Sequence, residues 1–131
     1  MSYSYSKISQ ARLESCHPEI RRLFTSLIED YDVSIICGHR TEEEQNQAIL
    51  DGASKTEYPN SKHNEYPSLG IDAALWPIDW NDHGRHYMFV GIVRERALKL
   101  GIPIRCGADW DSDFKTNDQT FNDLVHFEYA G

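Results

Sequence analysis

The sequence is poor in cysteine and has no long hydrophobic run. Its 131 residues include three cysteines, Cys16, Cys37 and Cys106, and no Cys-x-x-Cys pair. An odd number of cysteines is a poor disulfide framework, so we expect free thiols and synthesis in a reducing compartment. No apolar stretch approaches the length of a membrane span, which argues against stable membrane insertion. The first residues also lack the apolar segment of a signal peptide.

Positive charge is scarce as well. Lys and Arg number 13 against 21 Asp and Glu, which gives a formal net charge of −8 at pH 7. An acidic surface repels phosphate backbones and other polyanions, so general nucleic-acid binding is disfavoured. Any contact with a polyanionic polymer must therefore come from a specific cleft. The hydrophobic fraction of 40% is that of a globular protein, and the length suits one domain over residues 1–131.

Hydrophobic periodicity and turn residues predict helices and strands in uneven alternation. Helices are expected over 18–31, 41–51 and 83–100, strands over 33–37, 71–75, 102–106 and 124–129, and long loops over 53–69 and 107–122. Neighbouring strands of this kind can pair antiparallel. We therefore expect an α+β fold, with a small antiparallel sheet and helices packed on one face.

Three side chains of the types that bind metals lie in or beside the predicted strands: His63, Asp72 and His126. Because alternate strand residues share a face, His126 and Glu128 should point to the same side of the sheet. Two imidazoles and one carboxylate leave the fourth position of a zinc ion open, as in catalytic sites. Asp123, three residues before His126, is then the candidate base. From spacing alone, ordinary core or surface roles for these residues stay open.

The acidic segment after residue 107 has a pattern of its own. Asp109, Asp111 and Asp113 alternate like the start of a calcium-binding loop, but Phe114 stands where an EF-hand needs Gly. We therefore expect a solvated acidic loop. The tryptophans could either line a cleft or pack in the core; they are Trp76, Trp80 and Trp110.

Seven short segments follow one another in a characteristic order. They are Gly38-His-Arg-Thr-Glu-Glu-Glu-Gln45, Ser61-Lys-His-Asn64, Gly70-Ile-Asp72, Trp76-Pro-Ile-Asp-Trp-Asn-Asp82, Leu100-Gly-Ile-Pro-Ile-Arg105, Gly107-Ala-Asp-Trp-Asp111 and Asn122-Asp-Leu-Val-His-Phe-Glu128. Together they resemble the D-alanyl-D-alanine carboxypeptidase and L-alanyl-D-glutamate endopeptidase family of zinc peptidases. The likeness is greatest to its single-domain phage endolysins.

The resemblance implies an α+β zinc peptidase with its site on the sheet. The family's Ser-x-His…Asp motif falls on Ser61, His63 and Asp72, and its acidic-x-x-His motif falls on Asp123 and His126. These positions imply Zn²⁺ bound by His63, Asp72 and His126, with Asp123 as the catalytic acidic residue. Ser61 is implied as a substrate-binding residue.

The resemblance also assigns Arg40, in the Gly-x-Arg segment, to catalysis and substrate binding. There it would hold a substrate carbonyl or carboxylate as negative charge develops. From the residues alone, Arg40 could instead form a surface ion pair with Glu43 or Glu44. Gly70 departs from the family pattern, in which a small residue such as Ala is expected.

The function implied is hydrolysis of an amide bond in a peptidoglycan stem peptide. We expect an L-alanyl-D-glutamate endopeptidase of the phage endolysin type that serves host cell lysis, monomeric and without a separate wall-binding domain. It would be made in the host cytoplasm without a signal peptide and act on the wall after release. The alternatives are a D-alanyl-D-alanine carboxypeptidase, a non-catalytic wall-binding or virion structural module, and a purely structural domain.

Overall fold

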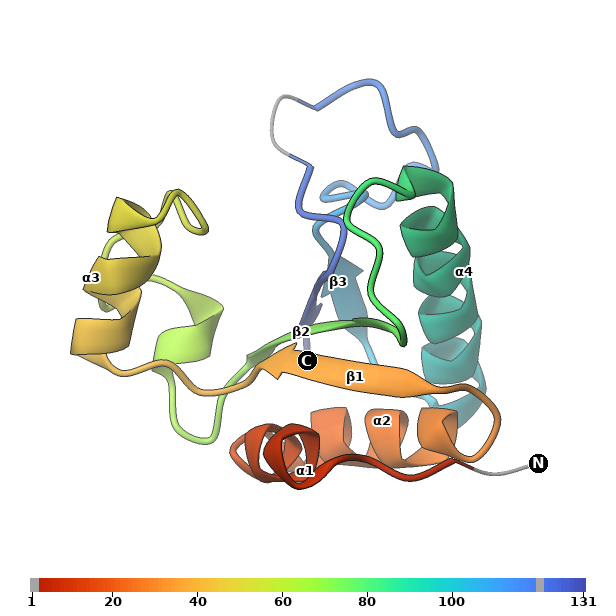
Figure 1. The fold of residues 1–131 in the computed structure, drawn as a ribbon. Coiled ribbons are helices and arrows are strands. Elements are labelled where there is room, and N and C mark those ends of the chain that lie inside the picture. Colours follow the sequence, from red (N-terminus) through yellow and green to blue (C-terminus); the bar gives the residue numbers. More distant parts are fainter. Residues whose placement is uncertain (1–2, 120–121) are drawn as a thin grey trace.

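Four strands form one antiparallel sheet in the order β1-β2-β4-β3 (Figure 1). The strands are β1 (Val33–Cys37), β2 (Gly70–Leu75), β3 (Ile104–Cys106) and β4 (His126–Tyr129). This computed structural model describes residues 3–119 and 122–131. The predicted α+β class with an antiparallel sheet is confirmed.

Two helices cover one face of the sheet, α2 (Pro18–Ile28) and α4 (His83–Leu100). The apolar side chains of α2 repeat at helical spacing and are buried, as the periodicity predicts. Phe127 of β4 lies between the two helices, with its ring 5.9 Å from Phe24 and 5.9 Å from Phe89, measured between centroids. The core is completed by Leu23, Leu27, Ile35, Ile71, Ala73, Val93 and Ala97.

The pleat of β4 separates this core from a polar face. Phe127 points into the core, whereas His126 and Glu128, on either side of it, point to the opposite face and contact each other. The shared face of His126 and Glu128 follows the prediction from strand alternation. The face of the sheet away from α2 and α4 is therefore available for a polar site.

A first helix, α1 (Lys7–Glu14), was not predicted from the sequence. It lies along the edge strand β1, where the Ser9 hydroxyl accepts a hydrogen bond from Ile35 N (3.0 Å) and Arg12 donates one to Ile35 O (3.0 Å). These contacts satisfy the outward backbone groups of an edge strand. Because polar side chains make them, α1 has almost no apolar periodicity to reveal it.

The remaining helices lie beyond the end of β1. Helix α3 (Glu42–Leu50) stands apart from the sheet in Figure 1 and begins at the predicted capping box, in which Thr41 and Glu44 cap each other's backbone. The segment predicted as the loop 53–69 contains a short 3₁₀ helix, η1 (Lys62–Asn64). Among the described residues, no helix is both long and apolar enough to cross a membrane.

Several predicted boundaries need correction. Helix 83–100 and strand 33–37 have the predicted bounds, and Gly101 ends α4 in the left-handed conformation at φ 70°. The helix predicted over 18–31 ends at Ile28, and the strands predicted over 102–106 and 124–129 begin later. Pro103 explains one of these differences, since it has no N–H to donate to a strand partner. The predicted loop 107–122 includes residues 120 and 121, which lie outside the described residues.

The packing around Phe24 predicts a large loss of stability on truncation. Phe24 is fully buried against Phe127, so Phe24→Ala leaves a cavity and should lower the free energy of unfolding by about 3–5 kcal/mol. Urea denaturation measures the change. Leu98→Ala, at a side chain on α4 that is 75% exposed, is the control and should cost less than about 1 kcal/mol. Equal effects of the two changes would contradict this core.

Candidate functional site

Strand register brings three chemically active side chains into one row across the sheet. Asp72 of β2 is paired with His126 of β4 on one side and with Cys37 of β1 on the other. The β1–β2 register shifts between Ile35 and Cys37, at the end of β1 that leads towards α3. Asp72 therefore lies between a histidine and a cysteine on the polar face.

His63 reaches the same place from outside the sheet, on η1. The Ser61 hydroxyl accepts a hydrogen bond from His63 N (3.2 Å), and the Asn64 side chain accepts one from Ser61 N (3.0 Å). Asn64 also donates to Arg40 O (3.1 Å), which ties η1 to the segment after β1. Ser61 thus holds η1 in shape, and it also lines the pocket next to His63.

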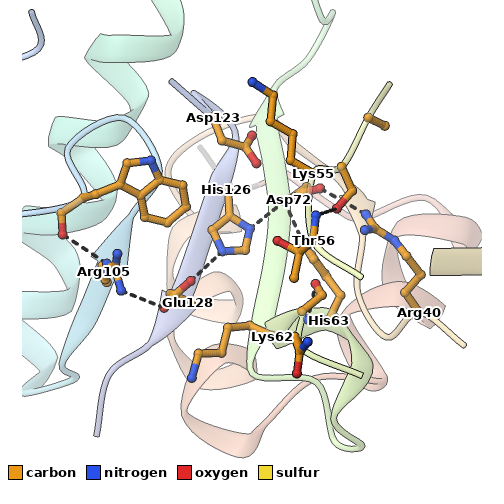
Figure 2. Close-up of a pocket in the computed structure, with 15 residues that line it drawn as sticks. Arg40, Lys55, Thr56, Lys62, His63, Asp72, Arg105, Asp123, His126 and Glu128 are labelled. Carbon is orange, nitrogen blue, oxygen red and sulfur yellow. Dashed lines mark hydrogen bonds and ion pairs between the residues drawn. The ribbon is translucent and has the colours of Figure 1, made fainter. Parts of the chain in front are cut away.

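The two imidazoles meet at one carboxylate oxygen (Figure 2). Asp72 Oδ1 lies 3.2 Å from His63 Nε2 and 3.1 Å from His126 Nδ1. The two rings lie edge to face, with their centroids 5.1 Å apart. The three side chains that the sequence singled out as metal ligands are therefore brought together, although 54 residues separate Asp72 from His126.

The outward nitrogen of each ring is also held. His63 Nδ1 lies 2.8 Å from the carbonyl oxygen of Gly38, and His126 Nε2 lies 2.9 Å from Glu128 Oε1. Both partners are acceptors, so each outward nitrogen carries the proton and a neutral ring would offer its lone pair to the side of Asp72. Such outer partners orient histidine ligands in metal sites. The donor set and its surroundings fit a divalent cation such as zinc.

The charges of the cluster also favour a bound cation. Burial alone would lower the pKa of each imidazole, but the Asp72 carboxylate outweighs burial and raises the pKa of His63 to about 10. Asp72 and Glu128 likewise raise the pKa of His126 to about 9. Burial raises the pKa of Asp72, yet the two imidazoles hold it well below its usual range. Asp72 thus remains a carboxylate at any ordinary pH.

Asp123 approaches the cluster from the segment before β4. Oxygen atoms of Asp72 and Asp123 and a ring nitrogen of His126 all lie within 4.8 Å of one another. Burial raises the pKa of Asp123, and the negative charge of Asp72 adds to this effect. Its backbone bonds to Gly107, where a Cβ would come within 2.3 Å of Asp123 O. A carboxyl group with a raised pKa beside a group of candidate metal ligands can accept and return a proton.

Arg40 lies on the other side of Asp72, and its side chain is only 11% exposed. Its guanidinium donates to Gln45 Oε1 (3.0 Å) and to Cys37 Sγ (3.4 Å), and it lies 3.8 Å from Asp72 Oδ2. The alternative of a surface ion pair with Glu43 or Glu44 is therefore wrong. Glu44 instead accepts a hydrogen bond from Thr41 N.

Gln45 and Cys37 contribute to the site without having been predicted. Gln45 is fully buried: its oxygen accepts from Arg40 and Asn64 (3.2 Å), and its nitrogen donates to Ser54 Oγ and Thr56 O. Gln45 is the one buried residue of α3, and no pattern in the sequence marked it. Cys37 belongs to the cluster through His63 and Asp72, with ligand atoms within 4.8 Å, whereas the sequence suggested only a free thiol.

The two imidazoles, Asp72, Asp123 and Arg40 line a pocket of about 280 Å³ on the polar side of the sheet. Trp110 is part of its wall, with its ring 5.6 Å from that of His126, whereas Trp76 and Trp80 are more than half exposed and lie elsewhere. The described residues that line the pocket are Arg40, Ala53, Ser54, Lys55, Thr56, Asn60, Ser61, Lys62, His63, Asp72, Arg105, Trp110, Asp123, His126 and Glu128.

The acidic loop is only partly as predicted. Asp111 and Asp113 are exposed, but Asp109 is 2% exposed and pairs with Arg94 of α4 at 2.9 Å. Asp109 also accepts hydrogen bonds from Asp113 N (3.2 Å) and Phe114 N (2.8 Å). The expectation of a wholly solvated loop is therefore wrong for Asp109, because a cation from a distant helix compensates its burial.

Comparisons with known proteins identify the family and the fold. The model of the family described as phage L-alanyl-D-glutamate peptidase matches residues 1–130. The L-alanyl-D-glutamate peptidase of Escherichia phage T5 is 31% identical over 124 residues, covering 91% of this chain and 90% of that protein. The crystal structure of Serratia marcescens L-Ala D-Glu endopeptidase ChiX has the same fold, with a TM-score of 0.72 at 20% identity over 96% of this chain and 90% of that one. The chain therefore belongs to the family of phage L-alanyl-D-glutamate peptidases.

Proposed function

We propose that this chain is a zinc-dependent endopeptidase that cuts the L-alanyl-D-glutamate bond in the stem peptides of peptidoglycan. The observation that supports it most directly is the meeting of His63 and His126 at one oxygen of Asp72, with both outward ring nitrogens held by acceptors. The family to which the chain belongs carries that activity in its description. An enzyme for this bond needs a way to activate both water and a carbonyl group.

In this proposal His63, Asp72 and His126 bind Zn²⁺. Bound there, zinc would polarise the scissile carbonyl and make a water molecule more acidic. The donor set of two imidazoles and one carboxylate is that of catalytic rather than structural zinc sites. Gly38 and Glu128 keep the two rings in the orientation that binding requires.

Asp123 and Arg40 perform the proton and charge steps. Asp123 takes a proton from the attacking water and later passes one to the leaving amine, for which its raised pKa is suited. Arg40 stabilises negative charge on the carbonyl oxygen as the tetrahedral state forms. Since Gln45, Cys37 and Asp72 already hold its guanidinium, little reorganisation is needed at that moment.

The wider context follows from the same proposal. We propose that the chain acts as a monomer and that Ser61, which lines the pocket, contacts the peptide backbone there. We propose synthesis in the host cytoplasm, with access to the wall after release.

Digestion of purified muropeptides followed by mass spectrometry tests which bond is cut. An endopeptidase exposes the amine of D-glutamate, whereas a carboxypeptidase releases terminal D-alanine.

The catalytic role of Asp123 predicts a loss of rate without loss of metal. Asp123→Asn cannot accept the proton of the attacking water, so kcat should fall by about 10²–10⁴-fold. The zinc content should stay close to that of the unaltered protein, because the ligands are intact. Asp51→Asn, which alters an exposed carboxylate at the end of α3, is the matched control and should retain full activity. Wild-type turnover by Asp123→Asn would exclude the role.

The ligand role of His126 predicts loss of the metal itself. His126→Ala removes one of three proposed protein ligands, so zinc should fall far below one ion per chain in elemental analysis after gel filtration. His83→Ala removes an exposed imidazole at the start of α4 and should leave the zinc content unchanged. Stoichiometric zinc in His126→Ala would refute the assignment.

The charge state of the cluster predicts that zinc binding depends on pH. In the metal-free protein the pKa values of His63 and His126 are raised to about 10 and about 9, so both rings are protonated at pH 7. Zinc needs both rings neutral, so binding at pH 7 should release about two protons and weaken as the pH falls below 9. Calorimetric titration in buffers of different ionisation enthalpy counts the protons. A pH-independent affinity between 6 and 9 would contradict this prediction.

A further inference from the structure

We propose that Lys62 and Arg105 bind a free carboxylate of the substrate, on the glutamate side of the bond that is cut. The inference rests on the proposed function and adds a recognition site to it. A glutamate whose amine is joined to alanine has two carboxyl groups, and the peptide can continue through only one of them. The other is left beside the scissile bond as a carboxylate or, if modified, as a carboxamide.

Lys62 and Arg105 come from different parts of the chain and reach the same side of the pocket. Arg105 on β3 is paired in register with Glu128 on β4, and its Nη1 lies 4.0 Å from Glu128 Oε2. The positive charge of Lys62 also acts on Glu128. Figure 2 shows Arg105 beside Glu128 and the side chain of Lys62 running below it.

The charges on this side of the pocket do not balance. Glu128 is buried and committed to His126 through one oxygen, at 2.9 Å. Lys62 and Arg105 together supply two positive charges against that single negative charge. Among the described residues, none forms a hydrogen bond or an ion pair with the Lys62 ammonium. In a chain of net charge −8, such a local excess of positive charge marks a place for an anion.

Arg105 is held in place before a ligand arrives. Arg105 Nε donates to Trp110 O (3.0 Å), and its guanidinium lies over the Trp110 ring, 5.0 Å from the centroid. The Nη groups are thereby turned towards the pocket side on which Glu128 lies. A cation positioned in advance loses less entropy when it binds a carboxylate. Lys62 belongs to η1, and its exposed side chain can turn to meet the same group.

Arg40 does not bind the same substrate carboxylate in this proposal. It lies across the cluster from Lys62 in Figure 2, and Gln45, Cys37 and Asp72 already engage its guanidinium. The pocket therefore has two separate positions for negative charge. Arg40 faces the place where charge develops during the reaction, and the pair of Lys62 and Arg105 faces a charge that the substrate carries throughout.

The test compares two synthetic peptides that differ in one group. Both contain the L-alanyl-D-glutamyl bond; one keeps the free carboxylate next to that bond and the other has a carboxamide there. We expect kcat/KM to be about tenfold higher for the carboxylate peptide, the effect of one ionic contact in a partly solvated cleft. In Lys62→Gln and Arg105→Gln this ratio should fall towards one, and Lys62→Arg should restore most of it.

Lys55→Gln is the matched control, because Lys55 lines the same pocket on the side away from Lys62 and the change removes the same charge. It should keep the wild-type ratio. The zinc content of each variant is measured in parallel, and a normal content excludes an indirect effect through Glu128 and His126.

If the wild-type protein cuts neither peptide, the proposed function fails. If it cuts both equally well, or if Lys55→Gln changes the ratio as much as Lys62→Gln, carboxylate recognition by this pair is wrong although the function stands.

Discussion

The shared contact of two imidazoles with Asp72 Oδ1 is the constraint on which the polar side of this protein depends. A carboxylate enclosed on a central strand is costly unless cations compensate it, and His63 and His126 supply that charge at 3.2 and 3.1 Å. Antiparallel pairing places His126 directly beside Asp72, and η1 brings His63 to the remaining side. A divalent cation can take over the role of the two ring protons without any change in this framework.

The supports of the cluster come from the backbone as much as from side chains. The Gly38 carbonyl holds His63, and a Cβ at Gly38 would lie 2.2 Å from Arg12 O on α1. Helix α1 therefore does more than cover the edge of β1, because it packs against the turn that orients a proposed metal ligand. On the other side, the alternation of β4 buries Phe127 and leaves Glu128 free to hold His126. The four residues of β4 thus contribute both to the core and to the geometry of the proposed ligands.

Sequence patterns predicted those parts of the fold that depend on apolar burial or on local caps. Helix 83–100, strand 33–37 and the Thr41 capping box belong to this group. Sequence patterns failed where polar side chains make the tertiary contact. Ser9 and Arg12 do so on α1, and Arg94 does so for Asp109. Within the site, motif positions anticipated that His63, Asp72 and His126 would meet. Spacing along the chain could not reveal that Gln45 would be buried beneath Arg40, because that contact depends on where α3 stands relative to η1.

The chain is acidic overall but carries two cations beside the proposed zinc site, and Glu128 explains how a metal site and these cations can lie together. Two cations beside a proposed zinc site would by themselves weaken metal binding through repulsion. Glu128 lies between Arg105 and His126, where its carboxylate offsets one positive charge and fixes the ring at the same time. In the two proposals made above, one acidic residue thereby lets the pocket accept a metal ion and an anionic group side by side. The overall charge of −8 then discourages loose contact with polyanions, while this pocket retains a local preference for a carboxylate.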